Sequence, residues 1–115
     1  MYFDTLSCTA CEIVNSFPLE TLYNYRDSSD YELVVIYAPK LGEFELTIDI
    51  LQEKRLNYKA YVDSSFIYEN SNPEIRNCEL LHFCMVNDER KPIVFGNPLL
   101  SDEVWERYVD IICSN

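Results

Sequence analysis

The chain opens with Tyr2-Phe3-Asp4-Thr5-Leu6-Ser7-Cys8-Thr9-Ala10-Cys11-Glu12, a short apolar segment that runs directly into a C-x-x-C motif. Ser7 can accept a hydrogen bond from a free backbone N–H, and Glu12 favours the positive end of a helix dipole. Apolar residues follow at helical spacing until Pro18, which cannot donate in a helix interior and starts a second short helix. We therefore predict a strand and then a helix that begins at the cysteines.

The position of the two cysteines predicts redox chemistry. Unpaired N–H groups and the dipole at the helix start would stabilise a thiolate at Cys8, so Cys8 is expected to be the more exposed and more acidic thiol. Cys11, one helical turn later and facing the packed turn, is close enough to attack a mixed disulfide at Cys8 and release the substrate. The candidate catalytic residues are Cys8, which attacks, and Cys11, which resolves.

The middle of the chain alternates between strand and helix patterns. The β-branched run Leu33–Ala38, stopped by Pro39, predicts a central, parallel strand that is covered on both faces. Apolar side chains recur at i, i+3, i+7 and i+10 between residues 41 and 56, which is typical of an amphipathic helix. The opposite face of this helix carries an acidic row expected to face solvent: Glu45, Asp49 and Glu53. Residues 58–62 form a short strand.

The C-terminal part predicts a hairpin and a closing helix. Residues 64–70 form a helical turn, and Asn72-Pro73 forms a loop. The apolar runs 80–86 and 92–95 flank a tight connection and predict an antiparallel hairpin. Ser101 can start a helix whose apolar residues share one face: Val104, Trp105, Tyr108, Val109 and Ile112. The order is β-α-β-α-β and then β-β-α, which indicates the α/β class.

Length and charge exclude several classes of protein. With 115 residues the chain has the size of a single domain, 1–115. Twenty acidic residues against nine basic ones give a net charge of −11, which disfavours nucleic acid as a partner. No run approaches the roughly 18 apolar residues of a membrane span. The N-terminus lacks a secretory signal, which fits a cytoplasmic protein or the mature part of an exported precursor in the periplasm or cell envelope.

The three remaining cysteines have separate interpretations. Five cysteines cannot all pair within one chain. Cys84, inside an apolar strand, is expected to be an inert core thiol, whereas Cys78 in a loop is the better candidate for a third reactive thiol. Cys113 near the C-terminus is expected to be a free surface thiol. A zinc site at the C-x-x-C pair would need two further ligands, and no second C-x-x-C exists.

Several of these stretches together carry a family resemblance. They are Tyr2-Phe3-Asp4 before Cys8-Thr9-Ala10-Cys11, the strand Leu33–Ala38 ending in Pro39, and the hairpin His82–Gly96. Over nearly the whole chain the sequence resembles the thioredoxin-like superfamily. The hairpin is similar to the T-F-L-I-D-x-x-G-K-I-V stretch of bacterial extracytoplasmic thioredoxin-like reductases. The segment Gly96-Asn97-Pro98-Leu99, with Trp105 after it, is similar to thioredoxin-like domains of bacterial envelope proteins.

The resemblance implies a fold and an activity. The fold is a thioredoxin-like β-α-β-α-β-β-α arrangement with a central mixed sheet flanked by helices. The activity is that of a thiol-disulfide oxidoreductase, which needs no organic cofactor and no metal. Its partners are protein or small-molecule thiols and disulfides. Leu81 and His82, immediately before the hairpin strand, are expected to line the substrate groove.

Two departures from the family pattern concern this groove and the motif itself. The family usually has a cis-proline at the position that corresponds to Leu81. A cis bond before another residue costs about 2.5–4 kcal/mol, so we expect a trans peptide and an altered groove. The dipeptide Thr9-Ala10 replaces the Gly-Pro of thioredoxin, and no Trp precedes Cys8. His82 could steer proton transfer, because imidazole titrates near neutral pH, or simply make a local hydrogen bond.

A second function class stays open beside the oxidoreductase. In a non-catalytic thioredoxin-like interaction module the cysteines would be incidental or would form a structural disulfide. The absence of proline at position 81 favours this alternative. The overall negative charge could then favour basic partners.

Overall fold

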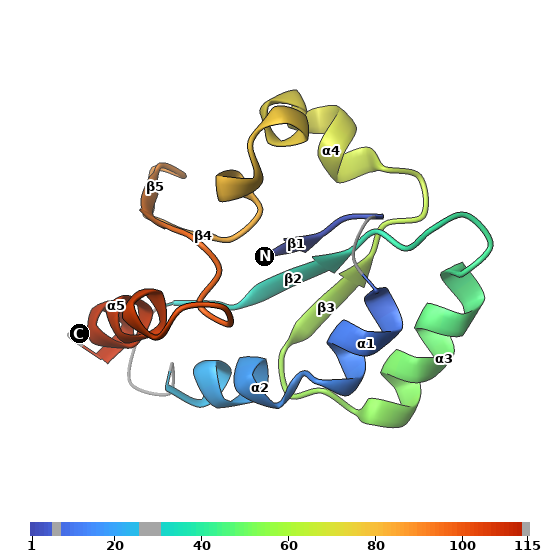
Figure 1. The fold of residues 1–115 in the computed structure, drawn as a ribbon, viewed down its shortest axis with the longest axis horizontal. Helices are drawn as coiled ribbons and strands as arrows, with labels where there is room; N and C mark the ends of the chain where they lie inside the picture. Colours follow the sequence, from blue (N-terminus) through green and yellow to red (C-terminus); the bar gives the residue numbers. More distant parts are fainter. Residues whose placement is uncertain (6–7, 26–30, 114–115) are drawn as a thin grey trace.

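Strands and helices alternate along the chain, as Figure 1 shows for the computed structural model, which describes residues 1–5, 8–25 and 31–113. The strands are β1 (Tyr2–Phe3), β2 (Val34–Tyr37), β3 (Lys59–Val62), β4 (Cys84–Val86) and β5 (Pro92–Phe95). The helices are α1 (Thr9–Val14), α2 (Phe17–Asn24), α3 (Phe44–Lys54), α4 (Ile67–Ser71) and α5 (Asp102–Cys113). The predicted α/β class is confirmed, whereas the four-strand order β-α-β-α-β-β-α expected from the family resemblance is not, because the described part of the chain has five strands and the additional helices α2 and α4. None of the helices in the described ranges has the length and apolar character needed to cross a membrane.

β2 is the central strand of a three-stranded parallel sheet, with the order β1-β2-β3. Ile36 pairs with Tyr2 on one side and with Tyr61 on the other. The predicted central, parallel strand is therefore confirmed. Its cover is incomplete, because Val35 is fully buried whereas Val34 at the start of the strand is 42% exposed.

The sheet separates two apolar clusters, because successive strand residues point to opposite faces. Phe3 belongs to a cluster with Ile13 of α1 and Leu19 of α2, and Leu51 of α3 packs against it. Tyr2, the neighbouring residue, belongs to the cluster on the opposite face; its other buried members are Ala38 and Ile75. Figure 1 accordingly shows α1 and α3 on one side of the sheet and α4 on the other.

The hairpin forms a sheet of its own, in place of the single mixed sheet expected from the family resemblance. β4 and β5 pair antiparallel, with Met85 opposite Val94. The backbone approaches the parallel sheet just before β4, where the N–H of Tyr2 donates to the carbonyl of His82 at 2.7 Å. The predicted strand 80–86 starts late because residues Glu79–Leu81 form a 3₁₀ turn.

Two further elements differ from the sequence prediction. The helix expected over residues 41–56 is shortened to Phe44–Lys54, and Leu41 is 98% exposed. The buried residue of this helix, α3, is Thr47. Its hydroxyl donates to the carbonyl of Glu43 and so needs no other partner. Asn72-Pro73 does not form a loop, because Pro73 starts a 3₁₀ helix that ends at Asn77. The acidic row of α3 is exposed, as predicted: Glu45, Asp49 and Glu53.

α5 closes the fold over the hairpin, as its apolar face predicts. The N–H of Val104 donates to the hydroxyl of Ser101 at 3.3 Å, which confirms Ser101 as the residue that starts the helix. Tyr108 and Ile112 are buried in a cluster with Met85 and Val94. The hydroxyl of Tyr108 also donates to the carbonyl of Gly96 at 3.0 Å. α5 is thus fixed to the turn that follows β5.

We expect Tyr108→Phe to destabilise the fold by about 1 kcal/mol, the usual net value of one hydrogen bond, because the Gly96 carbonyl loses its donor while the ring stays in place. Urea unfolding followed by circular dichroism measures this change. Tyr61→Phe is the control, because Tyr61 is 53% exposed. Equal stability of the two variants would show that the Tyr108 hydroxyl contributes nothing.

Candidate redox site

The C-x-x-C motif forms a disulfide at the start of α1. Cys8 and Cys11 are bonded, with their Cα atoms 5.2 Å apart. Cys8 is also the residue that caps the helix, because its sulfur accepts a hydrogen bond from the N–H of Cys11 at 3.3 Å. The capping role predicted for Ser7 falls outside the described residues. The prediction that these two cysteines can pair within the fold is confirmed.

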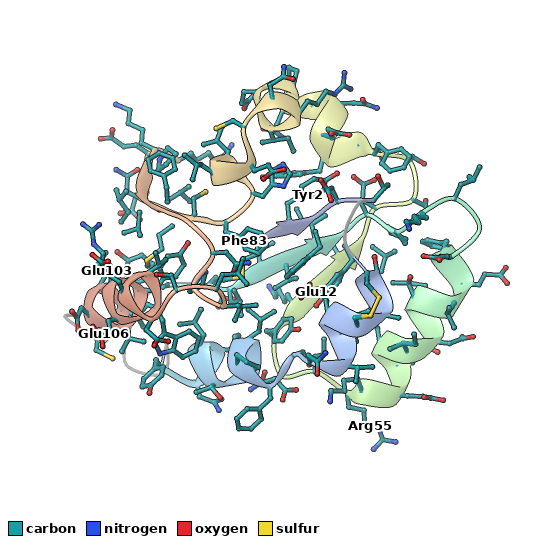
Figure 2. The ribbon with its side chains drawn as sticks, viewed as in Figure 1. Tyr2, Glu12, Arg55, Phe83, Glu103 and Glu106 are labelled. Atoms are coloured by element: carbon teal, nitrogen blue, oxygen red, sulfur yellow. A yellow bond between two sulfur atoms is a disulfide. The ribbon has the colours of Figure 1, made fainter. Side chains whose placement is uncertain are left out.

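The disulfide lies where the parallel sheet presents the carboxyl ends of its strands. α1 follows β1 at this edge, and Figure 2 shows the yellow sulfur bond at the start of the helix. Ile13, fully buried, anchors the short helix to the sheet. Both Cys8 and Cys11 are exposed, so the expectation that Cys11 faces the packed turn is wrong. The six-residue helix buries Thr9 and Ile13 and leaves Cys8 and Cys11 exposed.

A groove of about 500 Å³ has Glu12 of α1 in its wall. Its walls come from four parts of the chain: the end of β1, Glu12 of α1, the segment around the 3₁₀ turn and the segment after β5. The last two segments contribute Glu79, Leu80, His82, Phe83, Gly96, Asn97, Leu99 and Leu100. Glu12 directly follows Cys11, so one wall of the groove belongs to the helix that carries the disulfide. A second hollow, of about 750 Å³, is formed only by α3 and Arg55 behind it, away from the cysteines in sequence and without a wall from another element.

The two predicted groove residues lie in different surroundings. His82 lines the groove, and its Nε2 is 2.9 Å from the carbonyl oxygen of Ile75. Its ring meets the ring of Tyr2 edge to face, so the local hydrogen bond considered as an alternative is present. The side chain of Leu81 packs with the Tyr2 cluster, and its N–H donates to the carbonyl of Cys78. No cis peptide occurs in the described ranges, so Leu81 is trans as predicted.

Glu12 is a candidate site residue that sequence reasoning used only as a marker of the helix start. Its side chain is half-buried in the groove wall, and burial raises the pKa of its carboxyl group. Burial, a hydrogen bond with Tyr58 and the nearby charge of Glu12 raise the pKa of Tyr37. Glu12 therefore lies between the core and the groove. Its place directly after Cys11 is the signal that could have identified it.

The other three cysteines are unpaired with each other. Cys78 and Cys84 do not form a disulfide, as expected from the sequence, and Cys113 is exposed, also as expected. Cys84 is partly buried, and this burial raises the pKa of its thiol. Over the described part of the chain, no three metal-binding side chains gather into a site.

We expect alkylation of the fully reduced protein at mildly acidic pH to label Cys8 first and Cys84 last. The N–H of Cys11 can stabilise a thiolate at Cys8, whereas burial keeps the Cys84 thiol protonated. Mass spectrometry of a time course with iodoacetamide measures the order. Labelling of Cys78 or Cys113 ahead of Cys8 would contradict the argument from the helix start.

No protein-family model, curated protein or solved structure matches this chain. The residues and their geometry therefore carry the functional argument.

Proposed function

We propose that this protein is a thioredoxin-like thiol-disulfide oxidoreductase that exchanges electrons through Cys8 and Cys11. The observation that supports the proposal most directly is the exposed Cys8–Cys11 disulfide at the carboxyl edge of a parallel sheet. A disulfide that only stabilised the fold would gain most by closing a long loop, but this one spans a sequence separation of three. The exposure of this disulfide allows a substrate thiolate to attack it, but exposure does not increase the stability of the fold.

The reaction consists of two exchanges at sulfur. In the reducing direction, the Cys8 thiolate attacks a substrate disulfide, forms a mixed disulfide and releases the first substrate thiolate, which takes up a proton. The Cys11 thiolate then attacks the sulfur of Cys8 and releases the second substrate thiolate. The substrate gains two electrons, and the protein is left with the Cys8–Cys11 disulfide that the structure contains. The reverse sequence oxidises a substrate dithiol.

Equilibration with glutathione buffers tests the proposal. We expect the Cys8–Cys11 pair to titrate reversibly between dithiol and disulfide, with a midpoint between about −120 and −270 mV, the range of proteins that exchange disulfides. Mass spectrometry after acid quenching and alkylation measures the oxidised fraction. A midpoint below about −300 mV, typical of structural disulfides, would contradict the proposal.

The non-catalytic interaction module is the second candidate, and Leu81 is the observation that favours it. The N–H of Leu81 and the carbonyl of His82 are both used within the chain, by Cys78 and Tyr2 respectively. A substrate strand therefore has fewer free main-chain groups to pair with in this segment. In a module that uses the Cys8–Cys11 disulfide only as a structural bond, this disulfide would stay oxidised at every ratio of reduced to oxidised glutathione, so the same titration separates this case from the oxidoreductase.

A further inference from the structure

The groove that has Glu12 of α1 in its wall has an acidic lining. Asp4 at the end of β1, Glu12 of α1 and Glu79 of the 3₁₀ turn contribute carboxylates from three separate segments. None of the described residues that line the groove is a lysine or an arginine. Within the described ranges neither Glu12 nor Glu79 takes part in an ion pair. Glu12 and Glu79 therefore offer the groove negative charge that no ion pair with a described residue neutralises.

The same groove has an apolar rim. Leu80 is 62% exposed and Leu100 is 85% exposed, and both line the groove from segments that are far apart in the sequence. Phe83, labelled in Figure 2 beside β1, adds an aromatic ring to the wall and stacks edge to face on Phe3. Exposed apolar side chains beside unneutralised carboxylates suit a ligand that is both apolar and cationic.

We propose that this groove binds an extended polypeptide segment in which basic and apolar residues flank the cysteine that exchanges with Cys8. The proposal rests on the proposed function, because it assigns the class of substrate. Basic side chains of the segment would face Glu12 and Glu79, and apolar side chains would cover Leu80 and Leu100. The net charge of −11 also attracts a basic chain and repels anionic thiols such as glutathione.

Exchange rates with two matched peptides test the proposal. Each peptide carries one cysteine as a mixed disulfide with a neutral small thiol, flanked by leucine and either lysine or glutamate. At low ionic strength we expect the lysine peptide to react roughly fivefold faster or more with the reduced protein, and added salt to reduce this ratio because it screens exposed charges. The ratio should fall towards one in Glu79→Gln and in Glu12→Gln.

Glu45→Gln is the matched control, because Glu45 is exposed on α3 and does not line the groove. We expect it to keep the wild-type ratio between the two peptides. Equal rates with both peptides in the wild-type protein, or an unchanged ratio in Glu79→Gln and Glu12→Gln, would overturn the proposed groove. If Glu45→Gln lowered the rate ratio of the two peptides as much as Glu79→Gln and Glu12→Gln do, the proposed groove would also be overturned. The preference for the lysine peptide would then come from overall charge.

A direct binding measurement separates this proposal from the exchange reaction. Fluorescence anisotropy of the two peptides with serine in place of cysteine reports docking to the oxidised protein without any chemistry. Preferential binding of the lysine peptide, lost in Glu79→Gln, supports the groove even if no disulfide is exchanged, in which case only the proposed function fails. If both peptides exchange rapidly and do not differ in binding or in rate, the proposed peptide-binding groove is contradicted, and the proposed oxidoreductase function is still supported.

Discussion

Replacing Cys8 with serine is expected to lower the rate of disulfide exchange by at least roughly a thousandfold, the scale of loss when an enzyme loses its nucleophile. A serine hydroxyl does not ionise near neutral pH and cannot form a mixed disulfide. Replacing Cys11 with serine has a different expected result. Cys8 still attacks, but no thiol lies one helical turn away to release the product, so the mixed disulfide accumulates.

Reduction of a small neutral disulfide, followed together with intact mass, distinguishes the two variants. Cys11→Ser should gain the mass of one bound thiol, and Cys8→Ser should gain none at the motif. Cys113→Ser is the matched control, because this exposed thiol lies on α5 and takes no part in the disulfide. Wild-type rates in Cys8→Ser, or a loss of activity in Cys113→Ser, would contradict the assigned roles.

The elements that the sequence predicts well have strong local patterns. β2 comes from an uninterrupted β-branched run, and α5 comes from an apolar face that repeats with the helical period of 3.6 residues. α3 shows the limit of this reasoning. Its apolar residues occur on more than one side, because Leu46 is 55% exposed whereas Ile50 packs against the core. Packing against the neighbouring elements decides which side is buried, and places Thr47 there.

The candidate site divides in the same way. The spacing of Cys8 and Cys11 is enough to predict their disulfide, because one helical turn brings the sulfurs together. The groove is not predictable from any local pattern, since it joins residues from β1, α1, the 3₁₀ turn and the segment after β5. The family resemblance predicts Leu81 in this groove, whereas the 3₁₀ turn Glu79–Leu81 directs its side chain into the Tyr2 cluster and leaves Leu80 exposed at the groove.

Ile13 links the C-x-x-C motif to the core, so we expect Ile13→Ala to have the largest effect on stability among single substitutions in α1. Ile13 is fully buried against Phe3 and Leu19, and truncation of such a side chain costs about 2–5 kcal/mol through lost burial and the cavity left behind. Val14, the next residue of the same helix, is 59% exposed. Val14→Ala is therefore the matched control, with an expected change within about 0.5 kcal/mol.

Denaturant unfolding of both variants, in the oxidised and the reduced state, measures these changes. The expected difference between the variants arises because a short helix gains its stability from tertiary packing rather than from its own hydrogen bonds. With six residues, α1 depends on the burial of Ile13 to hold the Cys8–Cys11 pair at the edge of the sheet. Similar stabilities of Ile13→Ala and Val14→Ala would show that the disulfide, and not this side chain, fixes α1 in place. If the two variants also have similar stabilities in the reduced state, the disulfide does not fix α1 either. That outcome would contradict the packing of α1 on the sheet.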